Sequence, residues 1–155
     1  MQCMILLEIF KKLVKLTSPM KIWHQVVESG DMNLLDDILD KDCIFYSPVV
    51  FSPQAGKEIT KKYLSAAAIV FADESFKYTK EIESAKLACL EFELVLNEIK
   101  INGIDIISWN DDGKITEFKV MLRPLQAVEL IHKYMGQELK SVSYTHLRAH
   151  ETEPD

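Results

Sequence analysis

The sequence has few cysteines and no long uninterrupted hydrophobic run. Its three cysteines, Cys3, Cys43 and Cys89, are widely spaced and form no CxxC pair and no cysteine–histidine cluster. This spacing excludes a disulfide framework and the common zinc-binding arrangements. We therefore expect Cys43 and Cys89 to be buried and reduced, which indicates a cytoplasmic location. We expect no cofactor and no bound metal.

The sequence also lacks clusters of basic residues. Its 18 lysines and arginines are scattered and are outnumbered by 24 acidic residues, so that the formal net charge is −6. Phosphate groups are bound by clustered Lys and Arg side chains. The charge pattern therefore predicts neither a nucleic acid nor a membrane as partner.

The first residues, Met1 to Leu16, are apolar enough to suggest a signal peptide. However, Lys11, Lys12 and Lys15 interrupt the run, and no small-residue cleavage site follows. The apolar residues recur instead on one face of a helix, namely Ile5, Leu6, Ile9, Phe10, Leu13 and Val14. Residues 1–19 are therefore predicted to be an appended amphipathic helix or a non-native extension.

The length of 155 residues and the hydrophobic content of 48% predict one domain that folds without disulfides or metals. We place this domain at residues 20–139. Residues 140–155 show no apolar period and are predicted to be disordered. The segment SVSYTHLRAHET within them resembles a translated cloning adaptor. His146 and His150 have the i, i+4 spacing of zinc ligands, but no third ligand accompanies them.

Helical signals dominate the first half of the domain. A helix from Met20 is expected to stop at Gly30, and Asp31 to cap a second short helix through Leu39. Residues 43–51 have strand character but are interrupted by Pro48. After Gly56 a further helix is predicted to reach Phe71.

The second half changes to the period of two that is typical of strands. Strands are predicted around Phe76 and Tyr78, over residues 90–96 and over residues 99–109. A turn at residues 110–113 leads to a fourth strand, with Phe118, Val120 and Leu122 on one face. A final helix runs from Leu125 to about Leu139, with Val128, Leu130 and Ile131 buried. Helices followed by an antiparallel, curved sheet indicate an α+β fold with helices on one sheet face.

Asp105 is the anomaly in this pattern, because it shares a strand face with apolar residues. These residues are Ile99, Ile101, Ile107 and Trp109. A buried carboxylate must find hydrogen bonds or raise its pKa above about 3.9 and stay protonated. A neutral carboxyl group in a cavity can donate a hydrogen bond to a ligand carbonyl. Two alternatives remain: Asp105 is bound only by a backbone amide or a tyrosine, or the opposite strand face is the buried one.

Three segments resemble the SnoaL-like group of the nuclear transport factor 2-like superfamily. They are WHQVVESGD at Trp23–Asp31, FYSPVV at Phe45–Val50 and NGIDIISWNDDGKITEFKVMLRPL at Asn102–Leu125. The resemblance implies a cone in which a curved antiparallel sheet wraps around helices, opens into an apolar pocket and often pairs as a dimer. Members include ketosteroid isomerases, polyketide cyclases, epoxide hydrolases and binding domains.

The resemblance also implies roles for individual positions. The buried oxyanion-hole aspartate of the isomerases falls on Asp105, their helix tyrosine on Trp23 and their proton-shuttling aspartate on Ser47. Serine is no general base near neutral pH, so isomerisation by that route is not expected. The arginine of the epoxide hydrolases falls on Gly103, and the last strand offers Glu117 in place of their second aspartate, so that route is not supported either.

Several other side chains are candidates for the pocket. Ser47 lacks the Gly-x-Ser-x-Gly surroundings of a nucleophile and is expected in a turn or strand. His24 and His132 are expected at the surface or in a groove. Tyr46, Tyr63 and Tyr78 offer hydroxyl groups, although aromatic residues at such spacings usually belong to a core. The predicted pocket-lining residues are Trp23, Ser47, Tyr63, Phe92, Ile107, Trp109, Phe118 and Val120.

Three functions follow as alternatives. The first is a protein that binds a small apolar or carbonyl-bearing molecule and forms a homodimer through the outer sheet face, where Ile104 and Ile106 lie. The second is an isomerase- or cyclase-type enzyme that uses Asp105 as acid or base on an enolisable ketone or a polyketide-like substrate. The third is a non-catalytic dimerisation module whose interior is filled by side chains.

Overall fold

The structure is a computed structural model, which describes residues 1–151 of the chain, with the side chains of residues 13–17 and 142–151 left out of the description. Helices and strands are given in chain order. They are α1 (Gln2–Thr17), α2 (Met20–Ser29), a 3-10 turn η1 (Met32–Leu34), α3 (Leu35–Ile38), β1 (Leu39–Tyr46), β2 (Gln54–Ala55), α4 (Lys57–Val70), β3 (Lys77–Glu83), β4 (Leu87–Leu96), β5 (Ile99–Trp109), β6 (Ile115–Arg123) and α5 (Leu125–Glu151).

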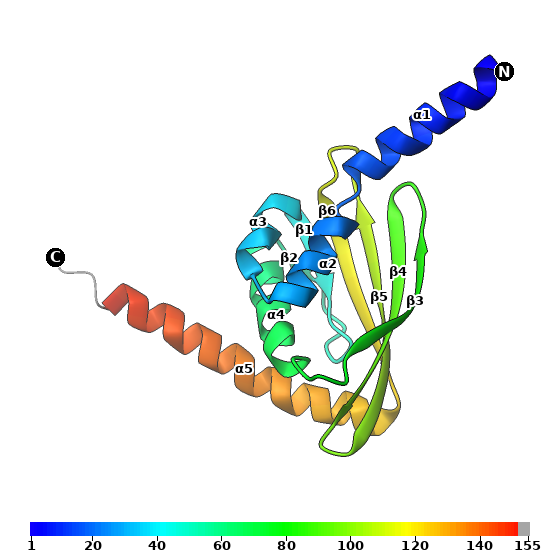
Figure 1. Cartoon of the computed structure of the whole chain (residues 1–155). Helices are drawn as coiled ribbons and strands as arrows, with labels where there is room; N and C mark the ends of the chain where they lie inside the picture. The colour runs from blue at the N-terminus through cyan, green and yellow to red at the C-terminus, as the bar shows by residue number, and fades with distance from the viewer. Residues whose placement is uncertain (152–155) are drawn as a thin grey trace.

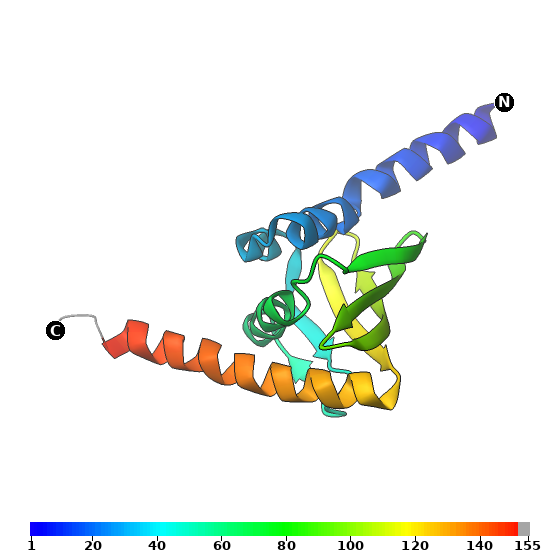
Figure 2. The ribbon, with the colours of Figure 1, turned by 60° about the horizontal axis from the view of Figure 1, so that its bottom comes forward.

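The six strands form one curved sheet in the order β2-β1-β6-β5-β4-β3. All neighbouring strands are antiparallel except β1 and β6, which are parallel. Helices α2, α3 and α4 lie within the curve of the sheet, and α5 crosses below them (Figures 1 and 2). The predicted α+β class, with helices on one face of a mostly antiparallel sheet, is confirmed.

The long hairpin of β5 and β6 follows the sequence pattern closely. Asn110 closes its turn, accepting a hydrogen bond from the Gly113 amide at 3.0 Å. Gly113 has a φ of +71°, a left-handed conformation that glycine adopts without steric cost. Alternate residues of β5 from Ile101 to Trp109 are buried, as the period of two predicts.

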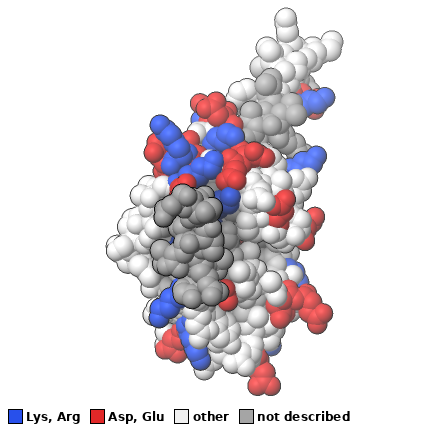
Figure 3. All heavy atoms as spheres, turned by 90° about the vertical axis from the view of Figure 1, so that its left-hand side faces the viewer, with Lys and Arg blue, Asp and Glu red and all other residues white. Residues whose placement is uncertain are grey.

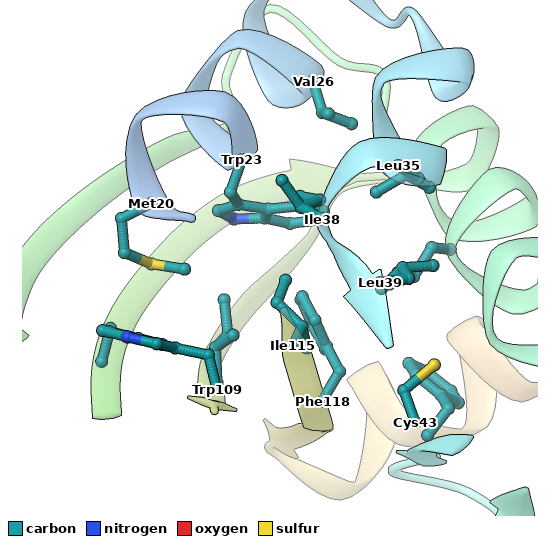
Figure 4. Packing of buried hydrophobic residues seen from close by; sticks show 14 of the residues in the cluster. Met20, Trp23, Val26, Leu35, Ile38, Leu39, Cys43, Trp109, Ile115 and Phe118 are labelled. Carbon is teal, nitrogen blue, oxygen red and sulfur yellow. The ribbon is translucent and has the colours of Figure 1, made fainter. Parts of the chain in front are cut away.

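Two clusters of buried side chains lie between the sheet and the helices. The first joins α2, α3 and β1 to the upper parts of β5 and β6, and Figure 4 shows Trp23, Trp109 and Phe118 within it. The second joins α4 and α5 to β4 and β5. Full burial of one large apolar side chain contributes about 1.5–3 kcal/mol, so these clusters are the main source of stability.

The region around β1 differs from its prediction. Leu39 was expected to end a helix, but it begins β1, where it pairs with Ile115 of β6 and is buried. Pairing with β6 therefore overrides the local helical pattern. The strand ends at Tyr46, before Pro48, and Phe51 lies fully exposed beyond the sheet.

Helix α5 extends further than expected. Ala127, Ile131 and Met135 form its buried stripe, while Val128 and Leu130, which were expected to be buried, are only half-buried. The backbone is helical to Glu151, whereas the prediction ended the helix near Leu139 and expected disorder from residue 140. The sequence has no proline between Pro124 and Pro154, so no strong helix breaker stops the helix earlier. The side chains of His146 and His150 lie outside the described residues.

Of the two cysteines that were predicted to be buried, one is. Cys43 is buried and unpaired, as expected. Cys89 is only half-buried, because it precedes Leu90 on β4 and therefore lies on the outer sheet face. Over the part of the chain that the structure describes, no helix is both long and apolar enough to cross a membrane.

Candidate functional site

A cavity of about 520 Å³ lies between the helices and the sheet. Its walls come from the inner faces of α2 and α4, the aromatic residues of β3 and β4, and the inward positions of β5 and β6. Four exposed residues among those that line it, Glu28, Ser29, Gly30 and Ala72, place the opening between the C-terminal ends of α2 and α4.

Asp105 lies in the middle of β5 and is the carboxyl group of the cavity interior. Its neighbours across the sheet are Leu90 on β4 and Val120 on β6, both of them apolar. Only 6% of Asp105 is exposed. Burial raises the pKa of the carboxyl group to about 7, although a hydrogen bond from Tyr78 partly opposes this rise. The group therefore exchanges its proton near neutral pH.

Two further side chains form an ordered chain of hydrogen bonds that ends at Asp105. The Tyr78 hydroxyl donates to Oδ2 of Asp105 at 2.7 Å, and Nε1 of Trp23 donates to the Tyr78 hydroxyl at 3.1 Å. An indole N–H can only donate, so it occupies a lone pair of the tyrosine oxygen and leaves the tyrosine proton for Asp105. Burial and the nearby Asp105 charge raise the pKa of Tyr78 well above 10, so the phenol stays protonated.

Tyr78 is the functional residue that the sequence did not single out. From the sequence, Tyr46, Tyr63 and Tyr78 offer hydroxyl groups equally, and their spacing favours a core position for all three. The structure places Tyr78 opposite Phe92 in the register of β3 and β4, on the inward face. Its position in the predicted strand could have indicated this role, because an inward-facing tyrosine needs a hydrogen-bond partner for its hydroxyl group.

Gly103 explains how Phe92 reaches the cavity. A Cβ atom on Gly103 would lie 2.3 Å from Cζ of Phe92 and 2.8 Å from Leu122. Phe92 is the direct partner of Gly103 in the neighbouring strand, so its ring lies across the glycine. The position that corresponds to the arginine of the epoxide hydrolases therefore has no room for a side chain.

Half of the predicted lining residues lie where they were expected. Trp23, Phe92, Phe118 and Val120 line the cavity together with Asp105. For Phe92, Phe118 and Val120 the agreement follows from strand parity, because inward positions of adjacent strands face the same interior, whereas Trp23 lies on the inner face of α2.

Ile107 and Trp109 do not line the cavity, although they share the inward face of β5 with Asp105. Both are buried in the first core cluster. Trp109 packs below Met20 and Trp23, as Figure 4 shows. The alternation along β5 predicts on which face of the sheet a residue lies, but not how far the cavity extends. Helix α2 fills the interior beyond Asp105 and closes the cavity there.

Ser47 and Tyr63 are also absent from the cavity wall. Ser47 follows the end of β1, and its Oγ accepts a hydrogen bond from the Val49 amide at 3.2 Å, as in a local turn. The ring of Tyr63 on α4 packs against Phe45 at a centroid distance of 5.2 Å. Both side chains have structural roles here.

The helical wall contains lining residues that the pocket prediction omitted. Each belongs to an apolar helix face or to the aromatic loop before β3, and the sequence gives no sign that a cavity adjoins them. They are Val26, Val27, Met32, Leu64, Ala67, Ala68, Phe71 and Phe76.

Among the described residues, those that line the cavity include no Lys, Arg or His. Its ionisable carboxyl groups are Asp105 inside and Glu28 and Asp73 near the opening. Hydrogen bonds from Ser75 lower the pKa of Asp73, so that this group is ionised at neutral pH. His24 instead pairs with Glu81 at 3.0 Å, and His132 is exposed on α5, so both lie outside the cavity as expected. Among the described residues, no group of three or more His, Cys, Asp or Glu side chains is arranged to hold a metal ion.

A cone-shaped α+β domain with an internal cavity is the architecture of the nuclear transport factor 2-like superfamily. Within it, the SnoaL-like domain family matches residues 21–118, and the chain belongs to this family. No functionally curated protein matches the chain.

Solved structures agree with this assignment. A steroid delta-isomerase from Pseudomonas aeruginosa is 29% identical, with a TM-score of 0.72 over 88% of this chain and 95% of the isomerase. An uncharacterised protein with a cystatin-like fold from Silicibacter pomeroyi is 27% identical, with a TM-score of 0.66 over 80% of this chain and 84% of its own. An NTF2-like protein from Mesorhizobium loti, 15% identical with a TM-score of 0.60 over 73% and 93% of the two chains, shows the fold alone.

Proposed function

We propose that this protein binds a small, uncharged and largely apolar molecule that presents a carbonyl oxygen to Asp105. The observation that carries the proposal is the buried carboxyl group of Asp105 in the wall of a cavity of about 520 Å³, where burial raises its pKa to about 7. A cavity of this volume is within the usual range for small-molecule sites. It favours ligand binding over a dimerisation module whose interior is filled by side chains.

Asp105 is suited to act as a hydrogen-bond donor. Because Oδ2 accepts from Tyr78, the proton of the neutral acid resides on the other oxygen and is available to a ligand. A ligand that accepts a hydrogen bond from this O–H group stabilises the neutral form, so its binding raises the pKa of Asp105 further. Binding should therefore be strongest below pH 7 and weaken above it.

The composition of the wall argues for an uncharged ligand. An anionic group inside the cavity would lack a basic partner, and Glu28 and Asp73 near the opening would repel it. A fatty acid or a phosphorylated ligand is therefore disfavoured. A neutral ketone or ester has no such cost.

The proposal is tested by titrating the protein with a neutral steroid enone, androst-4-ene-3,17-dione, and following the tryptophan fluorescence, to which Trp23 in the cavity wall contributes. Asp105→Leu keeps the branched shape of the side chain but removes the donor, and affinity should fall about tenfold or more. Glu28→Gln, at the opening, serves as the control and should bind as the wild type does. Equal affinity of the wild type and the Asp105→Leu variant would contradict the proposed anchor.

A second candidate is an enzyme that transfers a proton on an enolisable ketone. The 29% identity to a steroid delta-isomerase and the pKa of Asp105 near 7 favour it. Ser47 lies outside the cavity and supplies no second acid or base, so Asp105 would have to move the proton itself. Conversion of a β,γ-unsaturated ketone to the conjugated enone, followed by absorbance, should then vanish in Asp105→Asn. Absence of turnover in the wild type leaves binding as the function.

The same proposal includes a cytoplasmic location and a homodimer. Free cysteines at positions 43 and 89 support the reducing compartment. Half-buried Ile104 and Ile106 on the outer face of β5 support pairing through the sheet.

A further inference from the structure

Helix α1 lies apart from the domain and keeps its apolar side chains exposed. It projects from the N-terminus of α2 away from the sheet and the other helices (Figures 1 and 2). The N-terminal part of α1 forms mainly uncharged surface at the top of Figure 3. Six large apolar side chains on it are between 50% and 73% exposed, namely Met4, Ile5, Leu6, Leu7, Ile9 and Phe10.

Five of these side chains, all except Met4, occupy a broad arc of the helix. At about 100° per residue, the arc from Ile5 to Leu7 that includes Phe10 covers about 200° of the circumference. The remaining arc is about 160° wide, and Glu8, Lys11 and Lys12 lie within about 100° of it, with Met4 among them. An apolar arc of this width is wider than the narrow seam of a two-stranded coiled coil.

We propose that α1 docks onto the surface of an anionic lipid bilayer and lies in the plane of its interface. A helix of 16 residues is about 24 Å long, shorter than the hydrocarbon core of about 30 Å, and its lysines prevent it from spanning. A wide apolar face with lysines on the polar side is the pattern of interfacial helices.

Charge decides which part of the protein meets the bilayer. The sequence of α1 holds three lysines and one glutamate, a net charge of +2, which leaves −8 for the rest of a chain of net charge −6. An anionic surface therefore attracts α1 and repels the domain. The expectation of no membrane partner rested on the charge of the whole chain, and this proposal replaces it.

The junction between α1 and α2 is compatible with docking. Ser18 fixes the start of α2, because its Oγ donates to Glu83 at 2.6 Å and accepts from the Met20 amide at 3.2 Å. The cavity opens at the opposite end of α2, near Gly30, so a docked α1 leaves the opening free. The proposal is therefore independent of the proposed ligand.

Co-sedimentation of the full chain with lipid vesicles tests the proposal. Vesicles of phosphatidylcholine with ~30% phosphatidylserine should bind the wild type, and binding should weaken as salt is raised. Phe10→Glu should lower the partition coefficient about tenfold or more. The matched control is Ile82→Glu, the same kind of change at a side chain of β3 that is 73% exposed, and it should bind as the wild type does.

A double variant separates the charge contribution from the apolar one. Lys11→Glu combined with Lys12→Glu should abolish the preference for phosphatidylserine over pure phosphatidylcholine, and Lys41→Glu, an exposed lysine on β1, should preserve it. The circular dichroism melting curve should be the same for the wild type and Phe10→Glu, because α1 lies outside the domain core.

Failure of the wild type to sediment, or equal binding by Phe10→Glu, would overturn the proposal. Light scattering could also overturn it. If the wild type forms an oligomer that the Phe10→Glu substitution dissociates and that added vesicles leave intact, a second copy of the chain covers α1 in place of a bilayer.

Discussion

Replacement of Asp105 by Asn should change how the stability of the protein depends on pH. Asn has the shape of Asp and accepts the Tyr78 hydrogen bond, but it does not titrate. In the folded wild type, the pKa of Asp105 is about 7, whereas an ordinary Asp in the unfolded chain has a value of 3.8. The folded state therefore binds more protons than the unfolded state between these values.

The sign and size of the effect follow from linkage. For an acid with a raised folded pKa, stability falls as pH rises from about 4 to about 7, and the loss is complete above pH 7. A difference of about three pKa units corresponds to about 4 kcal/mol. About 3 kcal/mol of this loss should develop between pH 5 and pH 8. This amount is large beside the total stability of about 5–15 kcal/mol that is usual for a domain.

Urea denaturation monitored by circular dichroism at pH 5, 6, 7 and 8 measures the effect. The difference in unfolding free energy between Asp105→Asn and the wild type should shift in favour of the variant by about 3 kcal/mol over this range. Subtraction removes the contributions of other groups. Asp112→Asn, at an exposed position in the turn after β5, is the control and should give a constant difference.

A difference that stays constant within about 0.5 kcal/mol from pH 5 to pH 8 would refute the reasoning. It would mean that Asp105 is ionised in the folded protein throughout this range. Asp105 would then have no proton to donate to a ligand near neutral pH, and the proposed binding of a carbonyl oxygen would lose its basis.

Three further predictions concern the surroundings of this carboxyl group and the sheet. Tyr78→Phe removes a hydrogen bond that lowers the pKa of the Asp105 carboxyl group. The pH midpoint of the stability change that Asp105 causes should therefore move up by about one unit, whereas Tyr63→Phe should leave this midpoint unchanged. Gly103→Ala forces a methyl group into the ring on β4 and should lower the free energy of unfolding by about 1–3 kcal/mol in urea, whereas Gly136→Ala, with open space around it in α5, should be neutral or stabilising. Ile104→Glu should convert the proposed homodimer to a monomer in light scattering at micromolar concentration, and a wild-type monomer would contradict the proposed sheet interface.

Period-two alternation was sufficient to predict the central sheet. It placed the bounds of β5 and the inward face that carries Asp105, and the turn-forming residues Asn110 to Gly113 placed the hairpin turn. Alternation succeeds here because one face of each strand is buried and the other is not. The same pattern predicted which residues of β4 and β6 share the interior with Asp105.

The extent of the cavity could not be predicted in the same way. Ile107 and Trp109 have the same parity as Asp105, and only the position of α2 decides that they are core and not wall. The tyrosine beside Asp105 depended on the pairing of β3 with β4, a contact that no local pattern specifies. Leu39 likewise became a strand residue through its pairing with β6.

The indole at Trp23 has a consequence for how discriminating the cavity is. Because the Tyr78 hydroxyl is committed to Asp105, the described interior offers a guest one acidic proton and no second directional donor. A ligand that makes one hydrogen bond can rotate about it, and the apolar walls then select ligands by shape. The cavity should therefore bind a range of compounds of similar shape. It should distinguish poorly between isomers that differ only in the direction of their remaining polar groups.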